Sequence, residues 1–158
     1  MTPDKSKQKL TTWYIHRAYY SYRQAQILFN LFDYVESSIS SFEAIEFSVK
    51  AMCRLFNVCF KREHFVDAET LSILAKKVGK TSSNYEDQIL QAMPIILSYN
   101  EVLRNVSRYG IERQDVPSVS PTQIFGRSYA ESVFEDAKTF CNMLRKMETR
   151  KRWGLKLN

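Results

Sequence analysis

Two arginines in the second half of the chain have the spacing of a phosphate-binding pair. Arg104 and Arg108 lie four positions apart, so on a helix their guanidinium groups would project from the same face. A guanidinium binds phosphate through paired hydrogen bonds. Asn105 and Tyr109 stand next to them and carry further hydrogen-bond donors. We therefore take these four residues as a candidate nucleotide- or anion-binding set.

Glu46 and Lys50 form a second polar pair, with the i, i+4 spacing of an ion pair on a helix. From the spacing alone, the simpler interpretation is a solvated surface pair that contributes about 0.2–0.5 kcal/mol. The alternative is a pair that supports the anion site. Both residues lie within a strongly apolar stretch, so the two interpretations differ in whether the pair is buried.

Most catalytic templates are missing from the sequence. It contains no glycine-rich phosphate loop, no GxSxG, no HExxH and no CxxC. The two histidines, His16 and His64, are too few for a metal site without more converging ligands, so we expect no metal and no cofactor. We interpret His16, in the ring-rich first segment, as a packing residue.

The positive charge is concentrated near the end of the chain. Net charge is +6, and residues 145–158 hold six basic residues and one acid, whereas the preceding part is nearly neutral. The simpler interpretation of residues 149–158 is a solvated basic tail. The alternative is a nucleic-acid arm, in which Arg150, Lys151 and Arg152 contact phosphates and Trp153 stacks on a base.

The segments that carry these candidate residues have the sequence pattern of helices. Gly and Pro number only four each, which argues against an all-β fold. Residues 10–32 are rich in aromatic rings on more than one side, so we expect a helix that is buried or in a subunit contact. Asp33 and Glu36 then have capping-box spacing, and the next helix follows. Its apolar stripe is Val35, Ile39, Phe42, Ile45, Val49, Met52 and Phe56.

The remaining segments continue the helical pattern. One further helix is expected from His64 to Val78, ended by Gly79. The next is expected to start at a capping box formed by Ser83 and Glu86, to bend at Pro94 and to end at Gly110. The last is expected over residues 127–147. Residues 111–126 read as an irregular loop, which could be functional. We predict an all-α, antiparallel, four-to-five-helix up-and-down bundle over residues 10–148, after a polar leader at 1–9.

Cysteine usage and hydropathy indicate the compartment. The three cysteines, Cys53, Cys59 and Cys141, are an odd number and are expected to be reduced. No apolar run is long enough to span a membrane, and the lysine-rich start has no apolar signal core. We therefore expect a cytoplasmic protein that does not contact a membrane.

These motifs, taken in order, resemble the HEPN domain family from about Tyr14 to Lys146. The first half of the resemblance is carried by Tyr34-x-x-Ser37-Ser38, by Phe42-x-Ala44-x-Glu46-x-x-x-Lys50-Ala51, and by His64 before a helix with Leu71 and Leu74. The second half is carried by Arg104-Asn105, the Arg108-Tyr109 pair, a proline-containing loop and an alanine-spaced last helix.

The resemblance implies a helical bundle that pairs as a homodimer. Many members of the family are metal-independent ribonucleases, in which an Arg is followed after four to six residues by a His and supported by a Glu-x3-Lys pair. Others are toxins, partners of a minimal nucleotidyltransferase, or nucleotide binders. Glu46 and Lys50 match the supporting pair, and Arg104-Asn105 matches the start of the catalytic motif.

The chain departs from the ribonuclease pattern at one position. Four residues separate Arg104 from Tyr109, which stands where the catalytic His would be, and no histidine follows it. A phenol titrates near pH 10, so Tyr109 would be a poor general base at pH 7. The leading hypothesis is a non-catalytic homodimer that binds a nucleotide or RNA, or a nucleotidyltransferase partner. A ribonuclease with a degenerate Arg-x4-Tyr site and a structural helical adaptor are the alternatives.

Overall fold

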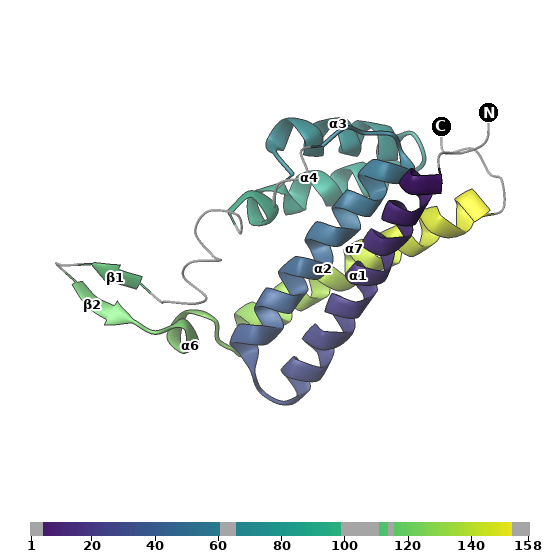
Figure 1. Cartoon of the computed structure of the whole chain (residues 1–158). Coiled ribbons are helices and arrows are strands. Elements are labelled where there is room, and N and C mark those ends of the chain that lie inside the picture. The colour runs from purple at the N-terminus through teal and green to yellow at the C-terminus, as the bar shows by residue number, and fades with distance from the viewer. Residues whose placement is uncertain (1–4, 61–65, 99–110, 114–115, 153–158) are drawn as a thin grey trace.

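The protein is an all-α bundle with one short β-hairpin beside it (Figure 1). The computed structural model describes residues 5–60, 66–98, 111–113 and 116–152. The helices are α1 (Lys5–Asn30), α2 (Tyr34–Leu55), α3 (Ala68–Gly79), α4 (Ser83–Ser98), α6 (Pro121–Ile124) and α7 (Arg127–Arg152). The strands are β1 (Ile111–Arg113) and β2 (Val116–Val119). The predicted helical bundle is confirmed.

The long helices α1, α2 and α7 form the body of the bundle, and α3 packs on α4 next to it (Figure 1). The apolar stripe predicted for α2 supplies much of the core, since Phe42, Ile45, Val49 and Met52 are almost fully buried. No helix in the described ranges is long and apolar enough to cross a membrane.

Small side chains line the places where the three long helices meet. Ala18, Ala25 and Ala44 have no exposed surface. The buried Ser37 hydroxyl of α2 donates a hydrogen bond of 2.9 Å to the backbone oxygen of Ala25 in α1. Short side chains allow the helices to approach closely, and the hydroxyl finds a partner that offsets its loss of water.

Side-chain caps set the starts of two helices. The Asp33 side chain accepts a hydrogen bond from the backbone N–H of Glu36, so the predicted start of α2 is confirmed. The Asp67 side chain accepts one from the backbone N–H of Thr70, so α3 begins at Ala68 and not at the predicted His64. His64 itself lies outside the described residues.

Gly79 has a different role from the one predicted. It is the last residue of α3, not a left-handed residue beyond the helix end. A Cβ at this position would lie 2.9 Å or less from atoms of the Glu86 side chain, so the glycine provides room for that carboxylate. The next helix includes Ser83 as its first residue, so Ser82 and not Ser83 occupies the position before it.

The segment predicted as an irregular loop is partly regular. Strands β1 and β2 pair antiparallel, with Ile111 opposite Val119, and α6 follows at Pro121–Ile124. Ser120 and Gln123 form a capping box before α6. The S-x-x-Q spacing and the proline at the first helical position were a sequence signal for this short helix that the prediction missed.

Two long helices extend beyond their predicted ends. Helix α1 begins at Lys5, within the segment expected to be a polar leader. Helix α7 continues to Arg152, so the first basic residues of the expected tail belong to a helix. The first helix was predicted from a ring-rich stretch and the last from its apolar spacing, and both sequence patterns stop before the backbone hydrogen bonding does.

Within the described ranges, two non-glycine residues adopt left-handed backbone conformations at helix ends. Phe32 (φ 63°) follows α1, and Asn57 (φ 52°) follows α2. In each case the next residue closes the helix end, since the N–H of Asp33 donates to Leu28 and the N–H of Val58 donates to Cys53. Asparagine tolerates this conformation, whereas a phenylalanine there is strained.

Replacing Phe32 with glycine is therefore expected to stabilise the fold. Its side chain is 75% exposed, so little apolar burial is lost. We expect Phe32→Gly to raise the free energy of unfolding by about 0.5–1 kcal/mol in urea denaturation. Asn57→Gly is the matched control and should gain only a few tenths of a kcal/mol. A loss of stability in Phe32→Gly would show that the ring supports the fold.

Candidate functional site

Glu46 and Lys50 form an ion pair on α2 in which Lys50 is buried and Glu46 is largely covered. Their Oε1 and Nζ atoms are 2.5 Å apart, and the side chains are only 17% and 5% exposed. The surface interpretation of this pair is therefore wrong. Lys50 is buried because α2 is covered over most of its circumference, and its neighbours Val49 and Ala51 have no exposed surface.

Burial changes what this pair can do chemically. Charges in the interior interact more strongly than at the surface, because less water screens them. Glu46 holds the Lys50 ammonium in one place through a charge-assisted hydrogen bond. An ammonium group has three donors, and such a positioned cation suits the recognition of a phosphate group.

The other predicted anion-binding residues lie outside the described residues. These are Arg104, Asn105, Arg108 and Tyr109, and Trp153 of the basic tail also lies outside them. Arg150 and Lys151 are exposed on the last turn of α7, and Arg152 ends that helix. Of the predicted anion-binding residues, the structure thus describes Glu46 and Lys50. Of the predicted basic tail, it describes the part that belongs to α7.

Basic residues of α7 also contact aromatic rings. The Arg145 guanidinium lies 6.0 Å from the ring centre of Tyr19, and the Lys146 ammonium lies 5.9 Å from that of Tyr85. The Tyr19 hydroxyl lies 3.5 Å from Glu148. Burial, followed by the charge of Glu148, raises the pKa of Tyr19 to about 12, so this phenol stays protonated.

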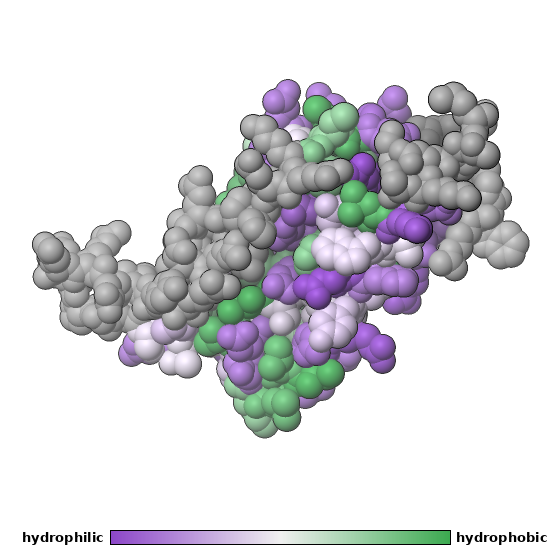
Figure 2. Space-filling model, viewed as in Figure 1, coloured by the Kyte–Doolittle hydropathy of each residue, from purple (hydrophilic) through white to green (hydrophobic). Residues whose placement is uncertain are grey.

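Helix α1 exposes a seam of large side chains away from the core. The seam residues follow one another at alternating spacings of four and three, as in a coiled coil. They are Trp13, Arg17, Tyr20, Gln24 and Ile27 of α1, of which Arg17 and Gln24 are partly buried, and Leu31, which directly follows the helix. Trp13, Tyr20, Ile27 and Leu31 are all between 49% and 68% exposed. Figure 2 shows apolar side chains gathered at the end of the molecule where α1 and α2 join.

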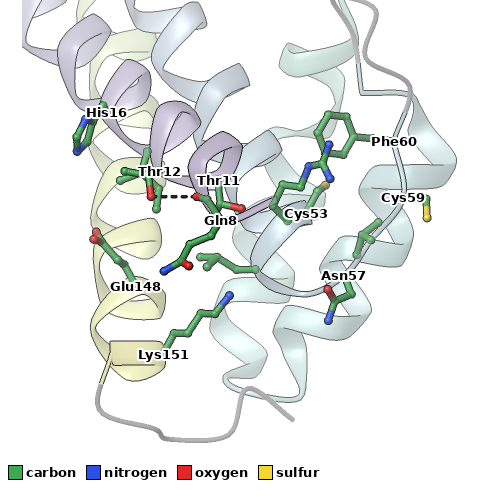
Figure 3. A pocket seen from close by; sticks show the side chains of 14 residues that line it. Gln8, Thr11, Thr12, His16, Cys53, Asn57, Cys59, Phe60, Glu148 and Lys151 are labelled. Atoms are coloured by element: carbon green, nitrogen blue, oxygen red, sulfur yellow. Dashed lines mark hydrogen bonds between the residues drawn. The ribbon is translucent and has the colours of Figure 1, made fainter. Parts of the chain in front are cut away.

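A pocket that the sequence analysis did not predict lies between the start of α1, the end of α2 and the end of α7 (Figure 3). Its volume is about 880 Å³. His16 lines it and is exposed, so the interpretation of His16 as a packing residue is wrong. No sequence motif could have indicated this pocket, because its residues come from three separate segments.

Removing one partner of the buried pair should be costly. Lys50→Met leaves the Glu46 carboxylate largely buried without its cation, so we expect unfolding free energy to fall by about 2 kcal/mol or more. Lys138 pairs with Glu135 at 3.2 Å, but its side chain is 49% exposed. The control Lys138→Met should therefore change stability by less than about 0.5 kcal/mol.

Urea denaturation measures the unfolding free energy of both variants. The double variant Glu46→Gln, Lys50→Met should recover part of the loss, because no charge is then left unpaired. Equal, small effects in Lys50→Met and Lys138→Met would contradict a buried pair.

Comparison with known proteins gives one match. A family model for the HEPN domain matches residues 11–147, which include most of α1, all of α2 and the Glu46–Lys50 pair. No curated protein and no solved structure shows significant similarity to this chain. The match covers most of the sequence and agrees with the helical bundle. The chain therefore belongs to the HEPN domain family.

Proposed function

We propose that this HEPN domain binds the phosphate groups of a nucleotide or RNA without cleaving them. The buried Glu46–Lys50 ion pair is the observation that carries the proposal. Replacing such a pair by apolar residues of similar size is often neutral or stabilising, so stability alone does not explain its presence. A fixed ammonium beside a carboxylate suits phosphate recognition.

The chemistry of the neighbouring motif supports binding over catalysis. Arg104 and Arg108 supply guanidinium groups for phosphate oxygens, and Asn105 and Tyr109 supply neutral donors. A ribonuclease of this family needs a general base, and the tyrosine at the position of the catalytic His does not ionise readily at neutral pH.

Arg104→Gln should weaken binding of a labelled single-stranded RNA, measured by fluorescence anisotropy, by roughly tenfold or more, because a charged hydrogen-bonded contact is lost. The control is Lys76→Gln, at the end of α3, which should bind RNA like the wild type because Lys76 is exposed. The neighbouring Lys77 is not used, because its ammonium donates hydrogen bonds to the backbone oxygens of Phe56 and Asn57.

The same RNA also tests the absence of catalysis. It should remain intact during long incubation with the wild-type protein. Cleavage that disappears in Arg104→Gln would replace the binding proposal by the ribonuclease alternative. Equal affinity in all three proteins would place the anion site elsewhere.

We also propose that the protein forms a homodimer through the α1 seam. A large exposed apolar surface commonly marks an interface, and the four-three spacing suits pairing with a second helix. Phe32, at the end of the seam, is exposed and held in a strained backbone conformation. Strain of this kind commonly accompanies a functional contact.

Light scattering should give twice the 18.6 kDa mass of one chain. Ile27→Glu should shift this mass to that of the monomer, because it places a carboxylate in the seam. Leu90→Glu is the control, since Leu90 is similarly exposed but lies on α4. A wild-type monomer would refute the dimer and would leave the seam free for a different protein, such as a minimal nucleotidyltransferase.

The basic end of α7 is proposed as a secondary contact to RNA. If Arg150 and Arg152 each neutralise a phosphate, binding releases counterions and weakens as salt rises. We expect the double variant Arg150→Gln, Arg152→Gln to flatten the slope of log K against log salt by roughly 1.4. Anisotropy titrations at several salt concentrations measure the slope. An unchanged slope would identify this end as solvated and uninvolved.

A further inference from the structure

We propose that the pocket between α1, α2 and α7 binds a small organic anion. Its phosphate or carboxylate group would contact Arg54 and Lys151, and its apolar body would lie beside Phe60. This inference goes beyond the proposed function, because neither Glu46 nor Lys50 is among the described residues that line the pocket.

The size and lining of the pocket fit a small organic molecule. A volume of about 880 Å³ lies within the range of small-molecule sites. Ile15, Val58 and Phe60 supply apolar surface, and Gln8, Thr11 and Asn57 supply polar groups. Such a mixture of apolar walls and a few polar side chains is typical of sites for organic ligands.

Arg54 has hydrogen-bonding capacity that the described residues do not use. Its guanidinium lies 5.3 Å from the ring centre of Phe60, which helps to hold the planar group in place. Its Nε atom is buried and has no hydrogen-bond partner within the described parts of the chain. Because this Nε atom is closed off, a bound oxyanion would accept paired hydrogen bonds from the terminal Nη atoms of the same guanidinium.

Lys151 gives the pocket a second cation from a different helix. Figure 3 shows the Lys151 and Gln8 side chains extending toward the middle of the pocket, with the Thr12 hydroxyl bonded to the Gln8 backbone oxygen. Glu148 is the carboxylate among the described lining residues, and it accepts a hydrogen bond from Tyr19. With two cations against one carboxylate, the described lining favours an anion.

The wall of the pocket formed by the end of α2 is rigid. Val58 donates a hydrogen bond of 2.7 Å to the backbone oxygen of Cys53, which closes the helix. The Lys77 ammonium donates hydrogen bonds to the backbone oxygens of Phe56 and Asn57. These contacts fix the turn that follows Arg54. A fixed wall lowers the entropic cost of binding, since little must be ordered when the ligand enters.

Isothermal titration calorimetry with three probes tests the proposal. Phenyl phosphate and benzoate combine a ring with an oxyanion, and phenol has the ring alone. We expect one phenyl phosphate or benzoate to bind per chain and phenol to bind at least tenfold more weakly. The stronger of the two anions identifies the charged group that the pocket prefers. Binding of phenol as tight as that of the anions, or no anion binding at millimolar concentration, would overturn the proposal.

Two variants locate the binding. Lys151→Met should weaken binding of the preferred anion by roughly tenfold. Lys146→Met removes the same charge from the same helix outside the pocket and should leave affinity unchanged. Equal weakening in the two variants would show attraction to a basic surface and would overturn the site. Both lysines are exposed, so neither change should disturb folding.

Cysteine modification gives an independent readout on the unmodified sequence. Cys59 lines the pocket and is exposed, whereas Cys53 and Cys141 are buried. Burial raises the pKa of Cys53 to about 12 and that of Cys141 to about 11, so neither thiol competes in the reaction. A saturating concentration of the preferred anion should slow alkylation of Cys59 by iodoacetamide severalfold, and phenol at the same concentration should not. Unchanged alkylation in the presence of the anion would contradict binding in this pocket.

Discussion

The close contact between α1, α2 and α7 depends on small side chains at the lines where these helices meet. Alanines and serines fill the contact, and the hydroxyls of Ser21, Ser37 and Ser48 have partners on a neighbouring helix. Ser48 of α2 lies 3.7 Å from the thiol of Cys141 in α7, which in turn lies 3.9 Å from the backbone oxygen of Ala18 in α1. A larger side chain at any of these positions would force the helices apart, because interiors are close-packed. The Glu46–Lys50 pair, the α1 seam and the pocket all lie on these three helices, so their positions follow from this contact.

Close packing around α2 explains why a charged pair is buried there. The helix has partners along most of its length, so Glu46 and Lys50 cannot both extend into water. Transfer of two charges into the interior is costly, and their mutual attraction offsets this cost only when the geometry is good. A bundle selected for stability alone would have apolar residues at both positions. The pair is therefore best understood as part of the anion site that this HEPN domain is proposed to carry.

Several surface features of the bundle also oppose stability. The α1 seam exposes large apolar side chains, Phe32 is held in a left-handed conformation, and the Nε atom of Arg54 is buried without a partner in the described residues. Each has a cost when the chain is isolated. A second molecule on the seam would bury its apolar side chains, and its contacts with Phe32 would offset the backbone strain there. The seam lies along the outside of α1, whereas Arg54 lies at the end of α2. The two surfaces can thus serve different ligands.

The class of fold, the cap at Asp33, the buried stripe of α2 and the i, i+4 spacing of Glu46 and Lys50 could all be predicted from the sequence. These are local properties, because helix propensity, caps and apolar periodicity act within a few residues. Burial of Lys50 and the pocket beside Arg54 arise only when the helices pack against one another. An i, i+4 pair has the same spacing whether it faces water or a neighbouring helix. The pocket joins residues more than 130 positions apart, from Gln8 to Lys151, and no local pattern encodes that meeting.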